Sequence, residues 1–302
     1  MTTSPDRVVD VAAVAEQPLA PPSANGGLTD VFRRRYLLKL LVQKELQARY
    51  QGSALGLLWS YVQPMVRFLM YFLVLGLILG LHHSVKNYAI HIFSGMTVVH
   101  YFTETFSSGT RAIVRNSAIV KKMAMPREMF PVASVIVSAI HVFPQMIILI
   151  VGAFFTGWVP TLGGVAAMMM SLLIITVLGT ALALLFSALN VFFRDFQNIV
   201  QTLTIFTTWI VPMIYPFATF AHGTAKHPLL YYIYLADPLA PAVLLMQKAV
   251  WLPTFMKGPI GYPDVPNHLW LLSFCTLGAC LGILLVCQLA FTRLENRIAE
   301  RL

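Results

Sequence analysis

Arg67 and Glu104 are charged side chains inside long apolar stretches, where a charge is costly and marks either a functional site or an ion pair. Arg67 lies eight residues after Trp59, and Glu104 lies seven residues before Arg111. In helices these separations correspond to depths of about 12 Å and about 10 Å from the same side. The matching depths permit a salt bridge between Arg67 and Glu104. The alternative is that Arg67 faces a channel.

The apolar stretches around these charges predict an all-α membrane protein. Hydrophobic residues make up 58% of the chain, charged residues make up 11%, and the mean hydropathy is +0.73. A soluble domain carries about 25% charged residues. A helix of about 20 apolar residues crosses a bilayer. Six segments reach this length and are predicted as transmembrane helices, at about 59–81, 88–110, 129–156, 162–190, 197–217 and 268–291.

If the six predicted helices cross the membrane in alternating directions, most of the 21 lysines and arginines fall on the same side of it. Lys and Arg stay on the cytoplasmic side of a membrane. The N- and C-termini are therefore predicted to be cytoplasmic. The net charge of +9 follows from this topology, and we expect no binding to nucleic acid. Counting 228–251 as a seventh span would move the basic C-terminal end outside, so six spans are favoured.

The remaining segments have different patterns. Residues 1–28 are rich in proline and predict a disordered N-terminal tail, which leaves 29–302 as the transmembrane domain. Residues 31–53 predict an amphipathic helix at the membrane interface, in contact with lipid, with Lys44, Glu45 and Arg49 near its end. A soluble basic helix is the alternative. Prolines break 218–266 into two short outer helices, 228–236 and 239–251, which we predict to be re-entrant.

Several function classes lack their motifs. Cys275, Cys280 and Cys287 have no metal-ligand or disulfide spacing, and His82, His83 and His91 are too isolated to indicate a metal site. No phosphate-binding G-x-x-x-x-G-K-[ST] motif occurs, so the chain has no ATP site of that kind. Paired carboxylates and DxD motifs are also missing. We therefore expect a protein that is not an enzyme and has no cofactor of its own.

The segment from Gln43 to Trp59, QKELQARYQGSALGLLW, resembles the entry segment of ABC-2 type permeases that export polysaccharides such as O-antigen, capsule and teichoic acid. The shared pattern is K-x-x-x-x-R-Y-x-x-S-x-L-G-x-L-W. Further similarity lies at Ile119–Lys122, Asn190–Asp195 and Asp237-Pro238, so the resemblance covers about 30–302. In its overall sequence pattern, rather than in any one motif, the chain is most similar to actinobacterial permeases for cell-wall galactan.

This resemblance implies a half-transporter in a bacterial plasma membrane. Two copies would form the membrane part, and each would dock a separate nucleotide-binding ATPase subunit that binds ATP and Mg. The expected cargo is a polyprenyl-pyrophosphate-linked glycan, moved from the cytoplasmic to the outer leaflet, and Arg67 could meet its pyrophosphate. A drug or small-lipid exporter of the same class is the alternative, and it would have a drier, more apolar fifth span.

Residues for a glycan channel follow from the polar stripe on the fifth span and the aromatic line on the first, because sugars have apolar faces and hydroxyl edges. The alternative is that Thr and Gln join helices by hydrogen bonds while aromatic rings anchor at the membrane interface. The predicted lining residues are Tyr61, Phe68, Phe72, Gln197, Gln201, Thr204, Thr208, Trp209 and Tyr215.

Two further sets of residues are predicted, and the first of them depends mainly on the resemblance. Basic loops would couple to the ATPase, although membrane topology alone explains their charge; their residues are Arg115, Lys121, Lys122, Arg127, Arg194 and Asp195. Three tyrosines in the outer segment would gate the exit, although an ordinary interfacial helix is the alternative; they are Tyr231, Tyr232 and Tyr234.

Overall fold

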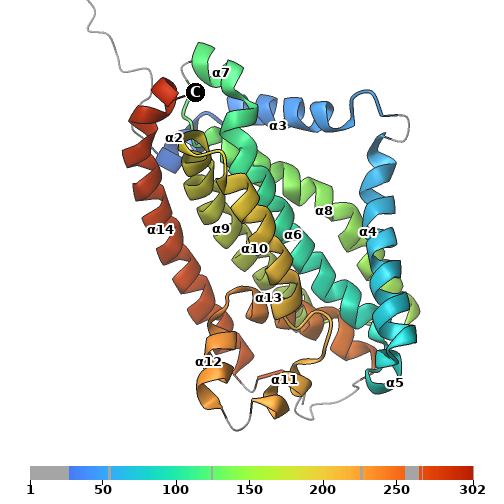
Figure 1. The fold of residues 1–302 in the computed structure, drawn as a ribbon. Coiled ribbons are helices and arrows are strands. Elements are labelled where there is room, and N and C mark those ends of the chain that lie inside the picture. Colours follow the sequence, from blue (N-terminus) through green and yellow to red (C-terminus); the bar gives the residue numbers. More distant parts are fainter. Residues whose placement is uncertain are drawn as a thin grey trace, which may run out of the picture.

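The computed structural model describes residues 27–53, 56–123, 125–224, 227–255, 265–266 and 268–301, and within these ranges every regular element is a helix (Figure 1). The all-helical prediction is therefore confirmed for this part of the chain. The predicted tail 1–28 lies outside the described residues except for Gly27 and Leu28, which begin helix α2 (Gly27–Arg33).

Within the described part of the chain, four helices are long and apolar enough to cross a membrane, which makes the chain a multi-pass membrane protein. They are α4 (Trp59–Tyr71) with its π-helical continuation Phe72–Ile78, α8 (Met129–Phe155), α9 (Leu162–Phe192) and α14 (Leu269–Arg301), whose apolar part ends at Glu295. A fifth candidate is a bent pair of helices, Leu229–Ala236 in α12 (Pro228–Ala236) and Leu239–Thr254, which begins with α13 (Leu239–Met246); the two are bent by 77°.

Helix α6 (Tyr88–Arg115) lies at the centre of the bundle, against α8 and α9 (Figure 1). Small residues permit this close approach, because Gly109 faces Ala183 of α9 and Gly179 faces Thr105 of α6. Helix α9 packs in turn on α14. Apolar side chains from α6, α8, α9 and α13 form the main hydrophobic core between these helices.

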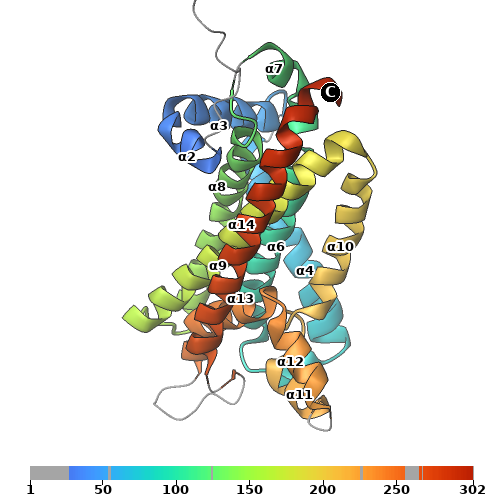
Figure 2. The same ribbon diagram turned by 90° about the vertical axis from the view of Figure 1, so that its left-hand side faces the viewer.

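Helix α10 (Phe196–Ile210) is shorter than the predicted span 197–217. Its end precedes Pro212, and a residue before proline is driven out of the helical conformation. Val211 is accordingly extended, with φ −75° and ψ 154°. Short helix α11 (Phe217–Gly223) follows after Pro216. Helix α10 stands at the edge of the bundle (Figure 2), and Val200 is its one buried residue among those described.

At one end of the bundle, α3 (Arg35–Tyr50) lies across the long helices (Figure 1). The predicted helix 31–53 is thus two helices, α2 and α3, which are separated at Arg34. Buried Leu38, Leu41 and Val42 attach α3 to a second, smaller core. The short helix α7 (Ser117–Lys122) follows α6 at the same end.

At the opposite end of the bundle, hydrogen bonds between side chains and the backbone hold the connecting segments together. The turn between α12 and α13 is stabilised by Asp237, whose carboxylate accepts the Leu239 N–H at 3.1 Å. Helix α13 continues as a π-helical segment, Gln247–Trp251. The Trp158 indole donates to Ala249 O at 2.9 Å, and the Trp251 indole donates to Lys86 O at 2.8 Å. These bonds tie the α8–α9 turn and the start of α6 to the bent pair. Short α5 (Leu81–Ser84) lies at this end too (Figure 1).

Candidate functional site

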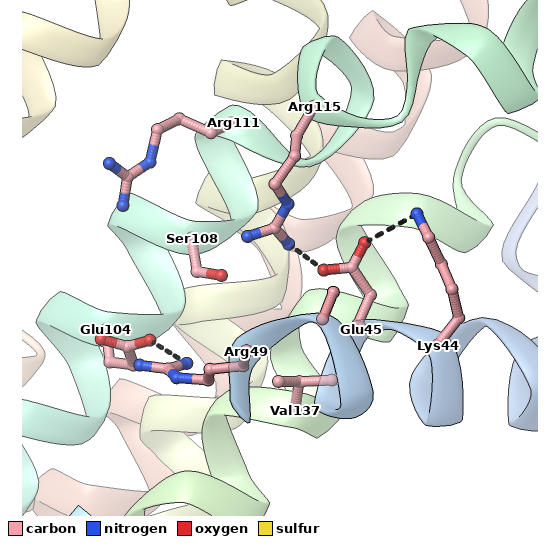
Figure 3. Close-up of a pocket in the computed structure, with 9 residues that line it drawn as sticks. Lys44, Glu45, Arg49, Glu104, Ser108, Arg111, Arg115 and Val137 are labelled. Carbon is pink, nitrogen blue, oxygen red and sulfur yellow. Dashed lines mark hydrogen bonds and ion pairs between the residues drawn. The ribbon is translucent and has the colours of Figure 1, made fainter. Parts of the chain in front are cut away.

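A polar pocket of about 280 Å³ opens where α3 crosses α6 (Figure 3). Four cationic side chains and two carboxylates dominate its wall. The lining residues are Lys44, Glu45, Ala48, Arg49, Glu104, Ser108, Arg111, Arg115 and Val137. We call it the basic pocket. It brings the three predicted residues of the amphipathic helix together with Glu104 and Arg115.

Glu45 is the buried carboxylate that joins α3 to the corner between α6 and α7. It is only 6% exposed and forms an ion pair with Arg115. The Asn116 side-chain amide donates to it at 2.8 Å, and Lys44 Nζ lies 3.8 Å away. Asn116 also accepts a hydrogen bond from Lys44 and stands at the N-terminus of α7. The position of α7 relative to α3 therefore depends on Glu45.

Of the two possibilities left open for Arg67, the salt bridge with Glu104 is not formed among the described residues, because Glu104 pairs with a different arginine. Arg49 Nη1 donates to Glu104 Oε1 at 2.7 Å (Figure 3). Depth along two neighbouring helices cannot reveal this partner, since α3 runs across the bundle and carries Arg49 to α6. This end of α3 is held further by Tyr50, whose hydroxyl lies 2.8 Å from Ser60 Oγ on α4.

Arg67 lies instead at a second pocket, of about 120 Å³, between α4, α6 and α10. The pocket brings Arg67 together with Thr208, one of the predicted lining residues. Its other lining residues are Tyr71, Met96, Val99, His100, Thr103 and Met213. We call it the Arg67 pocket. Arginine, threonine and tyrosine side chains supply hydrogen-bond donors for a phosphate or for sugar hydroxyls.

The residues of the QKELQARYQGSALGLLW segment shape the connection between α3 and α4. The Gly56 N–H donates to Ser53 Oγ at 3.0 Å. Gly56 has φ +45°, a left-handed conformation that glycine adopts most easily. A third pocket of about 280 Å³ borders this connection and shares Arg49 with the basic pocket; it is lined by Arg49, Tyr50, Ser53, Gly56, Trp59, Ser60, Gln63 and His141.

Most other predicted lining residues belong to α4 and α10. Phe68 packs edge-on against Phe93 of α6, with ring centroids 5.1 Å apart, and Phe72 stacks on Tyr88 at 6.4 Å. These two rings therefore contribute to helix packing within one copy. On α10, the hydroxyls of Thr204 and Thr208 bond to backbone carbonyls of their own helix.

The remaining predicted lining residues vary in exposure. Gln201 and Trp209 are exposed, whereas Tyr61 and Gln197 are half-buried. The Tyr215 hydroxyl donates to Ile210 O at 2.6 Å, just beyond the end of α10.

The predicted coupling residues separate into two groups. Lys121, Lys122, Arg194 and Asp195 are exposed. Arg115 and Arg127 are engaged within the chain instead, because Arg115 pairs with Glu45 and Arg127 donates to the Glu295 carbonyl of α14. These two arginines position α6 and α14, a role that the basic composition of 111–127 does not reveal.

The three predicted gate tyrosines also differ from one another. Tyr232 is 68% exposed, and Tyr231 is half-buried. Tyr234 is 7% exposed and stacks on Phe220 of α11, with ring centroids 3.8 Å apart. Tyr234 therefore fixes α12 to α11, which leaves Tyr231 and Tyr232 as the candidates for a gate.

Two histidines beside Glu104 are absent from the sequence-based site. Potential ligand atoms of His100, Glu104 and His141 all lie within 4.8 Å of one another. However, Arg49 already compensates the Glu104 carboxylate, and His100 Nδ1 lies 2.7 Å from Gln145 Oε1. This arrangement disfavours a divalent cation. The available signal was the four-residue spacing of His100 and Glu104, which places them on one face of α6.

Comparison with known proteins gives a family for the chain. The profile of the ABC-2 type transporter family matches residues 36–251. An O-antigen export system permease protein RfbA of Klebsiella pneumoniae is 25% identical over 265 residues, 87% of this chain and 94% of that protein. One of Myxococcus xanthus is 29% identical over 198 residues, 65% of this chain and 75% of that protein. Because this match covers nearly all of α3, every residue of the basic and Arg67 pockets, and most of the bent helix pair, the chain belongs to the ABC-2 type transporter family.

Proposed function

We propose that this chain is the permease subunit of an ATP-driven exporter that moves a lipid-linked polysaccharide from the cytoplasmic to the outer leaflet. The cargo we propose is a glycan of the cell-wall galactan or O-antigen kind, attached to a polyprenyl pyrophosphate. The observation that carries the proposal is the Arg67 pocket, a cavity between α4, α6 and α10 that the charged side chain of Arg67 lines together with Thr208. The names of the two relatives support a polysaccharide cargo.

The chemistry of the pocket suits such a cargo. A guanidinium binds phosphate oxygens through charge-assisted hydrogen bonds, so Arg67 is the proposed contact for the pyrophosphate. Gln197, Gln201, Thr204 and Thr208 give α10 uncharged polar groups over its length. Such groups can bond sugar hydroxyls without holding a polymer in place. The same stripe disfavours the alternative cargo, a drug or small lipid.

We propose that two copies flank the path. In the apolar window of α4 and its continuation, only 11% of the residues are buried, and α10 has Val200 as its one buried residue among those described. Outward-facing Leu203, Phe206 and Trp209 give α10 an apolar face. A second copy that packs on α4 and α10 would cover these faces and enclose the path between the copies.

The proposed topology has six crossings of a bacterial plasma membrane: α6 and α10 in addition to the four helices that are long and apolar enough to span it by themselves. Both termini are cytoplasmic in this proposal. Helix α3 lies in the inner membrane interface, beside lipid headgroups. The bent pair α12–α13 enters the outer leaflet partway, with Tyr231 and Tyr232 at the exit.

The motor in this proposal is a separate nucleotide-binding subunit, one for each copy. Exposed Lys121 and Lys122 on α7, together with Arg194 and Asp195, form its proposed docking surface. ATP and Mg bind to that subunit, and this chain carries no cofactor or metal of its own.

Depletion of the chain tests the proposal. Lipid-linked glycan should accumulate on the cytoplasmic leaflet, and complementation by Arg67→Gln should fail to clear it, whereas Arg67→Lys should clear it in part because it keeps the charge. Thermal melting of both purified variants controls for folding. Normal outer-leaflet glycan after depletion would refute export by this chain.

A further inference from the structure

We propose that the basic pocket is the docking site for the diphosphate headgroup of the lipid-linked substrate, before that headgroup reaches Arg67. This inference rests on the proposed function and adds a binding site to it. The proposed ligand is the diphosphate group of a lipid in the inner leaflet.

The charge balance of the pocket favours an anion. Lys44, Arg49, Arg111 and Arg115 outnumber the carboxylates of Glu45 and Glu104 by two to one. The two carboxylates also fix two of these guanidinium groups in place, because each forms an ion pair, Glu45 with Arg115 and Glu104 with Arg49. A positioned guanidinium loses less rotational freedom when it binds a ligand, so the pocket is preorganised.

Arg111 is the cation best placed to bind a ligand. Its Nε donates to Ser107 O at 3.2 Å, which orients the side chain along its own helix. Among the described residues, no hydrogen-bond or ion-pair partner occupies its two terminal nitrogens. Figure 3 shows this guanidinium on the opposite side of the pocket from Lys44. An anion bound at the terminal nitrogens of Arg111 would therefore break none of the ion pairs that hold the other side chains of the pocket.

The location fits a lipid headgroup. Helix α3 crosses the end of the bundle, and amphipathic helices of this kind lie at the level of lipid headgroups. A lipid with its phosphates at this level can keep its chains in the membrane. One water molecule takes about 30 Å³ in the liquid, so a pocket of this size has room for a small charged headgroup.

The basic pocket also adjoins the route toward Arg67. Arg49 lines both the basic pocket and the pocket at the α3–α4 connection. His100, one helical turn before Glu104 on α6, lines the Arg67 pocket. A diphosphate leaving the basic pocket would therefore pass from Arg49 toward Arg67.

Direct binding to the purified full-length protein tests the inference without requiring transport. The probes are polyprenyl pyrophosphate, the matching polyprenol and inorganic pyrophosphate. Arg111→Gln should weaken binding of polyprenyl pyrophosphate about tenfold, because one charge-assisted contact is lost. Lys39→Gln is the matched control: it removes one exposed positive charge from α3 outside the pocket and should leave the Kd unchanged. The polyprenol should bind more weakly than the pyrophosphate form in the wild type but equally to wild type and Arg111→Gln.

Each other outcome is decisive. If the wild type binds polyprenyl pyrophosphate and Arg111→Gln binds it equally well, the headgroup docks elsewhere, while the exporter proposal stands. If inorganic pyrophosphate alone shows the Arg111 dependence, the pocket serves a free phosphate compound, and the lipid form of the inference is wrong. If the wild type does not bind polyprenyl pyrophosphate at all, the inference and the proposed cargo both fail. Equal losses in Arg111→Gln and Lys39→Gln would indicate general electrostatic attraction and overturn the site.

Discussion

Arg49 and Glu104 form an ion pair at 2.7 Å that joins the end of α3 to the middle of α6. The two side chains are 30% and 21% exposed, so the pair is intermediate between a surface and a buried one. Its loss should therefore cost about 1–3 kcal/mol of stability.

We expect Arg49→Glu and Glu104→Arg to lower the melting temperature of the purified protein separately, and the double variant to recover much of the loss. Because Arg67 lies at a different pocket, the combination Arg67→Glu with Glu104→Arg should give no recovery and serves as the control. Recovery in that second combination, measured by the same melting experiment, would contradict the pairing described above.

Removal of the Glu45 carboxylate should destabilise the α3–α6–α7 corner more strongly. Glu45→Ala removes the ion-pair partner of Arg115 and one acceptor of the Asn116 amide, at a cost of about 3 kcal/mol for a buried pair. Glu45→Gln keeps one acceptor and should lose less. Melting temperatures would establish this order, with the exposed neighbour Gln47→Ala as a control that should change little. Wild-type stability in Glu45→Gln would show that the charge at this position contributes nothing, and identical losses for Ala and Gln would show that the remaining acceptor contributes nothing.

Gly109 should tolerate no larger side chain, because a Cβ there would collide with Ala183 of α9. We expect Gly109→Leu to separate α6 from α9 and to abolish a monodisperse peak in size-exclusion chromatography, since overpacking of a tight helix contact is strongly destabilising. At Gly163, near the start of α9, no atom lies within 4 Å of the position that a Cβ would take, so Gly163→Leu should fold normally. A well-behaved Gly109→Leu protein would mean that the two helices are not in close contact.

Reversal of two charges on α7 should weaken attachment of the proposed ATPase subunit. Lys121→Glu with Lys122→Glu changes exposed side chains only, so the fold should persist while co-purification of the ATPase falls and becomes more sensitive to salt. The same reversal at Arg33 and Lys39, on α2 and α3, provides the charge-matched control. Equal loss of the ATPase in both variants would argue against a docking surface on α7.

Local sequence signals account for much of the helical architecture. Long apolar runs indicate α8, α9 and α14, and Asp237-Pro238 marks the turn between α12 and α13. The predicted span 197–217 extends beyond the observed end of α10 because Val211 and Ile214 are apolar and continue the hydrophobic pattern, although Pro212 stops the helix.

The side-chain partners required the three-dimensional arrangement. Glu104 binds Arg49 because α3 crosses α6, and no spacing along the chain encodes that crossing. The sequence also does not reveal that Tyr234 is buried, because its neighbours in the chain resemble those of exposed Tyr232. Tyr234 is buried because it faces α11. Arg67 and Thr208 were each identified from the sequence, whereas their shared pocket became visible only in the fold.

The two ends of the helix bundle are held by different kinds of interaction. Trp158 and Trp251 donate hydrogen bonds at one end, and charged side chains join α3 to α6 at the other. Both bonds terminate on peptide oxygens, so dissolved ions screen them little, while the junction of α3 with α6 includes the partly exposed Arg49–Glu104 pair, whose full charges dissolved ions screen more. Raising the ionic strength should consequently destabilise the junction of α3 with α6 and have little effect on the end that contains Trp158 and Trp251. Amide exchange at increasing salt would then accelerate around residues 40–50 well before it does around residues 247–252.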